Sequence, residues 1–179
     1  MPLPEGRPAV THHVIQGEQR VSDDPNDVLA TLLGSCVAAC LHDPVARVGG
    51  MNHFLLPGNS GAERGQAERF GVHAMELLVN ALLVRGASRA RLEAKLFGGG
   101  NTMQGLSDIG SLNAAFAVSF LKQENIRLTS ECLGGSRGRR IQFWPVTGRA
   151  RRSFMGTTEI VPPPRAPRPV PASGALELF

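Results

Sequence analysis

Apolar positions along the chain fall into short runs separated by turn residues, which is the pattern of a strand-rich domain. Residues 28–33 and 37–41 are nearly continuous apolar runs, typical of buried strands. Residues 47–56 form a third extended run, which ends at Pro57. Three such runs in about thirty residues predict a meander of neighbouring strands. Further strands are predicted at 91–97, 126–131 and 139–144.

Two segments instead repeat their apolar residues with the period of a helix. Between residues 70 and 85 the apolar side chains trace one helical face, and Gly86 is predicted to end this helix. A second helix is predicted from residue 108 or 111 to about residue 125. Strands with two inserted helices indicate an α+β fold, a layered α/β sandwich with a strand-rich core.

The two ends of the chain differ from its middle. Residues 1–27 are polar and read as irregular, and residues 161–171 contain six prolines, which cannot form a packed element. We therefore expect an irregular extension over 1–14, one domain over 15–148, and a disordered Pro/Arg-rich tail over 149–179.

The net charge of +4 is concentrated near the C-terminus. Residues 137–179 hold 8 arginines against 2 acidic residues, whereas the remainder is slightly acidic, which disfavours a nucleic-acid surface on the domain. The apolar stretch 75–84 is too short to cross a bilayer, and the N-terminus lacks the apolar core of a secretory signal. These features predict a cytoplasmic protein without membrane insertion.

Cys36 and His53 are the best candidates for chemistry. Cys36 follows Gly34-Ser35 between two apolar runs, where backbone N–H groups can stay unpaired and donate hydrogen bonds to an oxyanion. A thiol needs a base because the thiolate is the nucleophile, and His53 lies within an extended apolar segment. The pattern predicts that the two side chains come within direct or one-water reach of each other.

Other readings of these residues are weaker. A zinc site of Cys36, Cys40 and His42 is disfavoured, because Cys36 and Cys40 would lie about 13 Å apart on a strand. The glycines at 98–100 could cradle an anion but lack the context of a phosphate loop. The arginines at 137, 139 and 140 are most simply interpreted as a solvated turn, with a partner surface as the alternative.

Six segments, in order, resemble the chemotaxis deamidase family CheD. They are Thr-Leu-Leu-Gly-Ser-Cys-Val-Ala (31–38), Gly-Gly-Met-Asn-His-Phe-Leu-Leu-Pro (49–57), Ala-Met-Glu-Leu-Leu (74–78), Leu-Glu-Ala-Lys-Leu-Phe-Gly-Gly (92–99), Ile-Gly-Ser-Leu-Asn (109–113) and Leu-Gly-Gly (133–135). The resemblance implies a fold similar to that of toxin-type cysteine deamidases. It also implies a cysteine hydrolase that converts glutamines of methyl-accepting chemoreceptors to glutamates.

In this resemblance Cys36 matches the nucleophile, His53 the general base, and Thr31 a threonine that assists the pair. No cofactor or metal is implied, and a CheC-type phosphatase is a possible inhibiting partner. Cys132 stands where an acidic residue is expected, which leaves the role of that neighbourhood open. Two alternatives remain: a Cys–His protease or transglutaminase, whose motifs are not matched here, and a non-catalytic chemotaxis adaptor.

Overall fold

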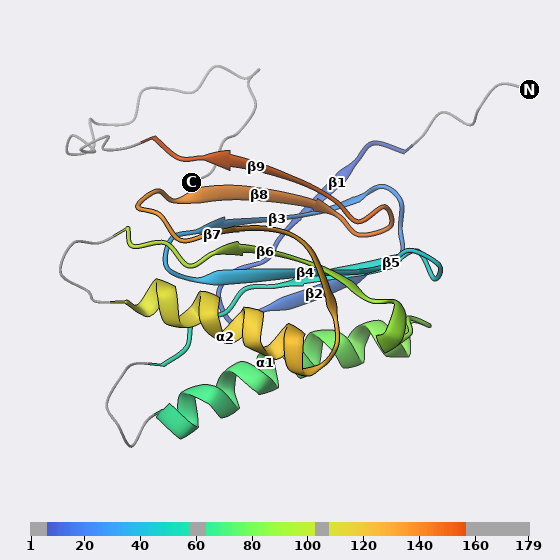
Figure 1. Cartoon of the computed structure of the whole chain (residues 1–179). Coiled ribbons are helices and arrows are strands. Elements are labelled where there is room, and N and C mark those ends of the chain that lie inside the picture. The colour runs from blue at the N-terminus through green and yellow to red at the C-terminus, as the bar shows by residue number, and fades with distance from the viewer. Residues whose placement is uncertain (1–6, 58–63, 103–107, 157–179) are drawn as a thin grey trace, which may run out of the picture.

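The computed structural model describes residues 7–57, 64–102 and 108–156, which form nine strands, two α-helices and a short 3₁₀ helix (Figure 1). The strands are β1 (Val10–His13), β2 (Gln19–Ser22), β3 (Asp27–Leu33), β4 (Val37–Asp43), β5 (Val48–Asn52), β6 (Glu93–Gly98), β7 (Arg127–Leu133), β8 (Arg139–Trp144) and β9 (Arg149–Phe154). The helices are α1 (Arg64–Val84), η1 (Arg89–Arg91) and α2 (Ile109–Gln123).

These elements stack in three layers. One sheet has the strand order β1-β3-β8-β9, and the second has the order β2-β5-β4-β6-β7. Both α-helices cover the outer face of the five-stranded sheet, with α1 against β5 and β2 and α2 against β6, β4 and β7 (Figure 1). The predicted α+β layered fold with two main helices is confirmed.

The central strand β4 is buried on both faces, which explains its continuous apolar sequence. Val37, Ala39 and Leu41 face the helices and join one core cluster. Ala38 and Cys40 point the other way and pack between the two sheets. Because successive side chains point to opposite faces, β4 contributes side chains to two separate cores.

The predicted meander is wrong at its first connection. β4 and β5 are antiparallel neighbours, but β3 lies in the other sheet, between β1 and β8. Both sheets need buried apolar strands, so composition cannot tell which sheet a run joins. The chain crosses between the sheets at residues 34–36, and Cys36 lies at this crossing.

Ordered structure extends further toward both ends than the sequence pattern indicated. β1 pairs in parallel with β3 and β2 pairs with β5, so the irregular reading of residues 1–27 is wrong there. β9 pairs with β8 beyond residue 148, within the segment expected to be a disordered tail. All three are edge strands with many polar and charged side chains, a composition that resembles that of a tail. The proline-rich segment 161–171 lies outside the described residues.

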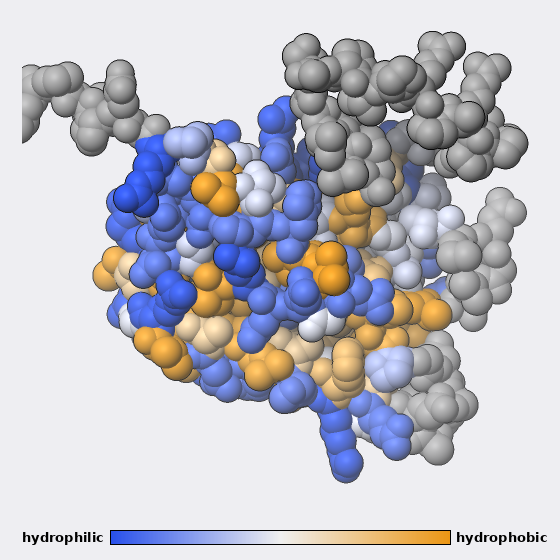
Figure 2. Space-filling model, turned by 180° about the vertical axis from the view of Figure 1, so that it is seen from behind, coloured by the Kyte–Doolittle hydropathy of each residue, from blue (hydrophilic) through white to orange (hydrophobic). Residues whose placement is uncertain are grey.

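The surface mixes apolar and hydrophilic residues. Phe70, Leu77 and Val84 of α1 are exposed, and Figure 2 shows apolar residues reaching the surface in small groups separated by hydrophilic ones. In the described part of the chain, no helix is both long and apolar enough to cross a membrane.

Candidate active site

Cys36 is half-buried in the crossing between the sheets, and the glycines that follow β6 hold this crossing in place. Gly99 N–H donates to the Cys36 carbonyl at 2.8 Å, and Gly100 N–H donates to the Gly34 carbonyl at 3.0 Å. Gly98 has a φ of +108°, and a side chain there would collide with the Cys36 carbonyl oxygen. Two of these N–H groups are thus committed to the cysteine loop, so the idea of an anion cradle in this run is wrong.

The register between β4 and the segment after β5 places Cys36 and His53 on one face. Val37 and Phe54 form an antiparallel bridge, and both face the helical layer. Because side chains alternate along extended backbone, Cys36 and His53 both face the other sheet. They are diagonal neighbours across the pair, a spacing that longer side chains can span.

Thr31 and a backbone carbonyl fix the imidazole of His53 from the opposite sheet. The Thr31 hydroxyl donates to the Val14 carbonyl at 2.6 Å, so it accepts the 2.8 Å hydrogen bond from His53 Nδ1. Nδ1 also lies 3.2 Å from the Val14 carbonyl, which can only accept. Nδ1 therefore carries the proton, and Nε2 of the neutral ring keeps the lone pair that a general base needs.

Burial keeps both members of the pair uncharged in the resting protein. It lowers the pKa of His53 below the usual 6.5, although the Val14 carbonyl partly opposes this shift. Burial also raises the pKa of the Cys36 thiol, with partial opposition from its own backbone N–H. The arrangement favours a thiol beside a neutral imidazole, so proton transfer would accompany nucleophilic attack.

The thiol of Cys36 makes its side-chain contact with Gln16 rather than with His53. Its Sγ lies 3.6 Å from Gln16 Oε1, and among the described residues it forms no hydrogen bond with His53. Catalytic hydrogen bonds are often long before substrate binds. One-water reach between Cys36 and His53 stays a prediction.

Asn113 of α2 joins the two arms of the site, and the sequence reading missed it. It is fully buried; its Oδ1 accepts from Leu56 N–H at 2.9 Å and its Nδ2 donates to the Ser35 carbonyl at 2.9 Å. One side chain thus ties the cysteine loop to the segment that follows His53. The sequence could have indicated this role, because an amide on the inward face of an apolar helix needs hydrogen-bond partners once it is buried.

Cys40 is a packing residue. It is 1% exposed between the sheets, and burial raises the pKa of its thiol far above the usual range, against a small opposing effect of Lys95. Such a thiol is inert as a nucleophile. Among the described residues, no group of three His, Cys, Asp or Glu side chains could hold a metal ion.

Cys132, where the family resemblance suggested an acidic residue, contacts two guanidinium groups. Arg139 Nη1 is 3.2 Å and Arg152 Nη1 is 3.3 Å from its Sγ. Arg139 is 1% exposed and donates to the carbonyls of Cys132 and Gly134. The interpretation as a solvated turn is therefore wrong for Arg139, because its guanidinium is buried and bound to carbonyls at the end of β7.

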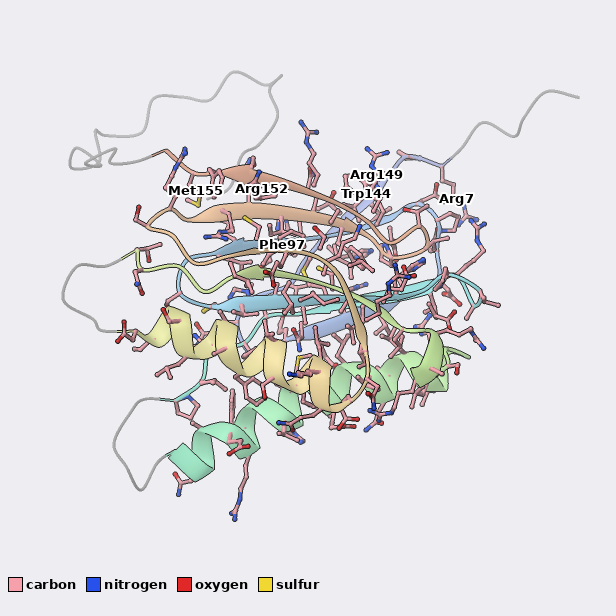
Figure 3. All side chains as sticks on the ribbon, viewed as in Figure 1. Arg7, Phe97, Trp144, Arg149, Arg152 and Met155 are labelled. Atoms are coloured by element: carbon pink, nitrogen blue, oxygen red, sulfur yellow. The ribbon has the colours of Figure 1, made fainter. Side chains whose placement is uncertain are left out.

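The β8–β9 hairpin carries further cation–π contacts. The guanidinium carbons of Arg137 and Arg152 lie 4.8 and 4.2 Å from the centre of the Phe154 ring. At the other end of the hairpin, Arg149 lies over Trp144 at 4.8 Å (Figure 3). These contacts explain how an arginine-rich segment forms an ordered edge strand.

Known proteins resemble this chain over most of its length. A family model described as CheD chemotactic sensory transduction matches residues 55–153. A probable chemoreceptor glutamine deamidase CheD of Acidiphilium cryptum (strain JF-5) is 56% identical over 175 residues, covering 93% of this chain and 92% of its own. Its counterpart in Caulobacter sp. (strain K31) is 52% identical over 178 residues, covering 96% and 94%.

Among solved structures, the hypothetical protein YfiH of Bacillus licheniformis aligns with a TM-score of 0.44 and 14% identity, over 72% of this chain and 61% of its own. The sequence relatives are far closer and span nearly the whole chain. On their identity and coverage, this protein belongs to the CheD family.

Proposed function

We propose that this protein hydrolyses the side-chain amides of glutamines on methyl-accepting chemoreceptors, with Cys36 as nucleophile and His53 as general base. The names of its relatives support the reaction and the substrate class. The observation that carries the residue assignment is the geometry of His53. Thr31 and the Val14 carbonyl hold Nδ1, which leaves Nε2 unprotonated on a ring that shares the face of Cys36.

The reaction follows from these protonation states. His53 Nε2 takes the proton of Cys36 as the sulfur attacks the carboxamide carbon of the receptor glutamine. The protonated imidazole then donates to the leaving nitrogen, and ammonia departs from the tetrahedral intermediate to leave a thioester. Water, deprotonated by His53, hydrolyses the thioester to release glutamate and restore the thiol. No metal or organic cofactor takes part in these steps.

Thr31 acts as a positioning residue in this scheme. Its hydroxyl accepts from Nδ1–H in the neutral ring and also in the imidazolium formed when His53 takes the thiol proton. That bond becomes charge-assisted at the moment of attack, so it stabilises the charged state more than the resting one. We also propose that the reaction takes place in the cytoplasm and that a CheC-type phosphatase inhibits this protein.

The deciding experiment measures ammonia release and the gain of about one dalton per modified glutamine on a receptor fragment. We expect Cys36→Ser to abolish both, because a serine hydroxyl is far less acidic than a thiol. Cys132→Ser, a matched substitution outside the pair, should keep most of the activity. Full activity in Cys36→Ser, or its loss only in Cys132→Ser, would place the nucleophile elsewhere.

The same samples test the adaptor alternative. A non-catalytic adaptor would bind the receptor fragment, yet the wild-type protein would release no ammonia and leave the mass of the fragment unchanged. Circular dichroism of each variant shows whether a loss of activity reflects a loss of fold.

A further inference from the structure

The turn between β1 and β2 is fastened to the backbone of His53. Glu18 N–H donates to the Ile15 carbonyl at 3.0 Å and closes the turn, and Gly17 adopts a φ of +88°, which favours glycine. Gly17 N–H donates to the His53 carbonyl at 2.8 Å, and His53 N–H donates to the Glu18 carbonyl at 3.0 Å. The position of this turn is therefore fixed relative to the general base.

Gln16 is the second residue of this turn, and its side chain reaches the thiol of Cys36. Its Oε1 lies 3.6 Å from Sγ, and the side chain is otherwise exposed to solvent. Gln16 makes no other side-chain hydrogen bond with a described residue, so its amide nitrogen is available beside Cys36. The turn thus presents a neutral carboxamide beside the nucleophile, 20 residues away along the chain.

The proposed reaction creates negative charge at this place. Attack by sulfur moves an electron pair onto the carboxamide oxygen of the substrate, and this oxyanion needs hydrogen-bond donors aimed at it. Within the described residues, the backbone N–H groups of Ser35 and Cys36 donate to no other residue. They supply donors from the cysteine loop, and the carboxamide of Gln16 approaches the same sulfur from the neighbouring turn.

We propose that Gln16 is a further catalytic residue, whose Nε2–H donates to the oxyanion formed when Cys36 attacks a substrate amide; this inference rests on the proposed deamidase function. In the resting protein Oε1 accepts from the thiol. Once the proton has moved to His53, that acceptor role ends. Rotation about the last side-chain torsion, which is broad for a carboxamide, turns Nε2 toward the substrate oxygen.

The charge and shape of glutamine suit this role. A carboxamide is neutral, so it stabilises the oxyanion without changing the charge of the resting pair, and bound substrate would shield the hydrogen bond from water. A carboxylate at the same position would repel both the thiolate and the oxyanion. An uncharged replacement, Gln16→Ala, removes the donor without adding charge, and it therefore separates the stabilisation of the oxyanion from the nucleophilicity of the thiol.

The test compares Gln16→Ala and Gln16→Glu in the full-length chain, with Gln123→Glu as a matched control. Gln123 is an exposed glutamine at the end of α2, and its variant should keep wild-type kcat. Loss of an oxyanion donor lowers kcat about 100- to 1,000-fold in enclosed sites. For this exposed donor we expect at least a roughly tenfold fall in Gln16→Ala and a larger fall in Gln16→Glu, with KM little changed.

A second readout separates this role from a structural one. Alkylation of Cys36 by iodoacetamide consumes the thiolate but forms no oxyanion, so Gln16→Ala should react at close to the wild-type rate. Unchanged kcat in Gln16→Ala would overturn the proposal, and so would an alkylation rate that falls in parallel with kcat. A one-dalton gain on Gln16 itself that requires Cys36 would also overturn it, because Gln16 would then be a substrate.

Two variants distinguish the role of Gln16 from the proposed function. If Cys36→Ser is inactive and Gln16→Ala fully active, the deamidase mechanism stands and only the role of Gln16 is refuted. If Cys36→Ser keeps full activity, the proposed function fails and the role of Gln16 fails with it.

Discussion

Removing the Thr31 hydroxyl tests how much the orientation of His53 contributes to turnover. Thr31 is 5% exposed in β3, and valine has nearly its shape. Thr31→Val should therefore keep the packing between the sheets. It deletes the group that accepts from His53 Nδ1 and donates to the Val14 carbonyl. The remaining 3.2 Å contact between Nδ1 and Val14 would hold the ring alone.

The expected magnitude follows from the state in which this hydrogen bond matters most. A hydrogen bond contributes about 0.5–1.5 kcal/mol between neutral groups and about 1.5–3 kcal/mol to a charged group. Because Thr31 also holds the neutral ring, only the difference, about 1–1.5 kcal/mol, lowers the barrier. Each 1.36 kcal/mol corresponds to a factor of ten in rate, so we expect kcat to fall roughly 5- to 10-fold in Thr31→Val, with little change in KM.

The assay is the steady-state rate of ammonia release from a receptor fragment, with thermal unfolding as the check on fold. Thr31→Ser keeps the hydroxyl and should retain most of the activity. Thr129→Val makes the same replacement at another strand hydroxyl, which donates to the Ala94 carbonyl at 3.1 Å outside the site. Wild-type kcat in Thr31→Val, or an equal loss in Thr129→Val, would refute the positioning role.

Three further predictions concern pH and stability. Because burial lowers the pKa of His53, the acid limb of kcat/KM should lie below pH 6.5; a limb above that value would contradict a buried neutral base. Asp43→Asn should lower the free energy of unfolding by about 1–3 kcal/mol in urea titrations, while Asp23→Asn, at an exposed pair, should change it little. Burial opposes ionisation of Asp43, but hydrogen bonds from Arg91 and three backbone N–H groups lower its pKa well below 3.8. The contribution of Asp43 to the free energy of unfolding is therefore complete above about pH 4, and it is lost as the pH falls through the pKa of the folded state. Gly98→Ala should reduce both the free energy of unfolding and kcat, because the alanine side chain would collide with the Cys36 carbonyl oxygen. Wild-type values for both quantities would contradict a rigid cysteine loop.

The sequence by itself determined the secondary structure of the middle of the chain. Periodicity separated the two helices from the strands because side chains repeat every 3.6 residues on a helix and every two on a strand. It also nominated Cys36 and His53, because a thiol and an imidazole are conspicuous within apolar runs. The resemblance to a known family added Thr31, which strand periodicity alone would read as an ordinary strand hydroxyl.

Only the tertiary structure decided which residues meet. A buried apolar strand has the same composition in either sheet, so the sequence did not show that β3 and β4 belong to different sheets, joined through Cys36. Edge strands such as β9 are polar because they face water, and local pattern cannot distinguish them from tails. The contacts of Thr31 with His53 and of Gln16 with Cys36 join residues 22 and 20 positions apart. Such pairs depend on strand register and on the path of a turn, which are set by packing across the whole domain rather than by neighbours along the chain.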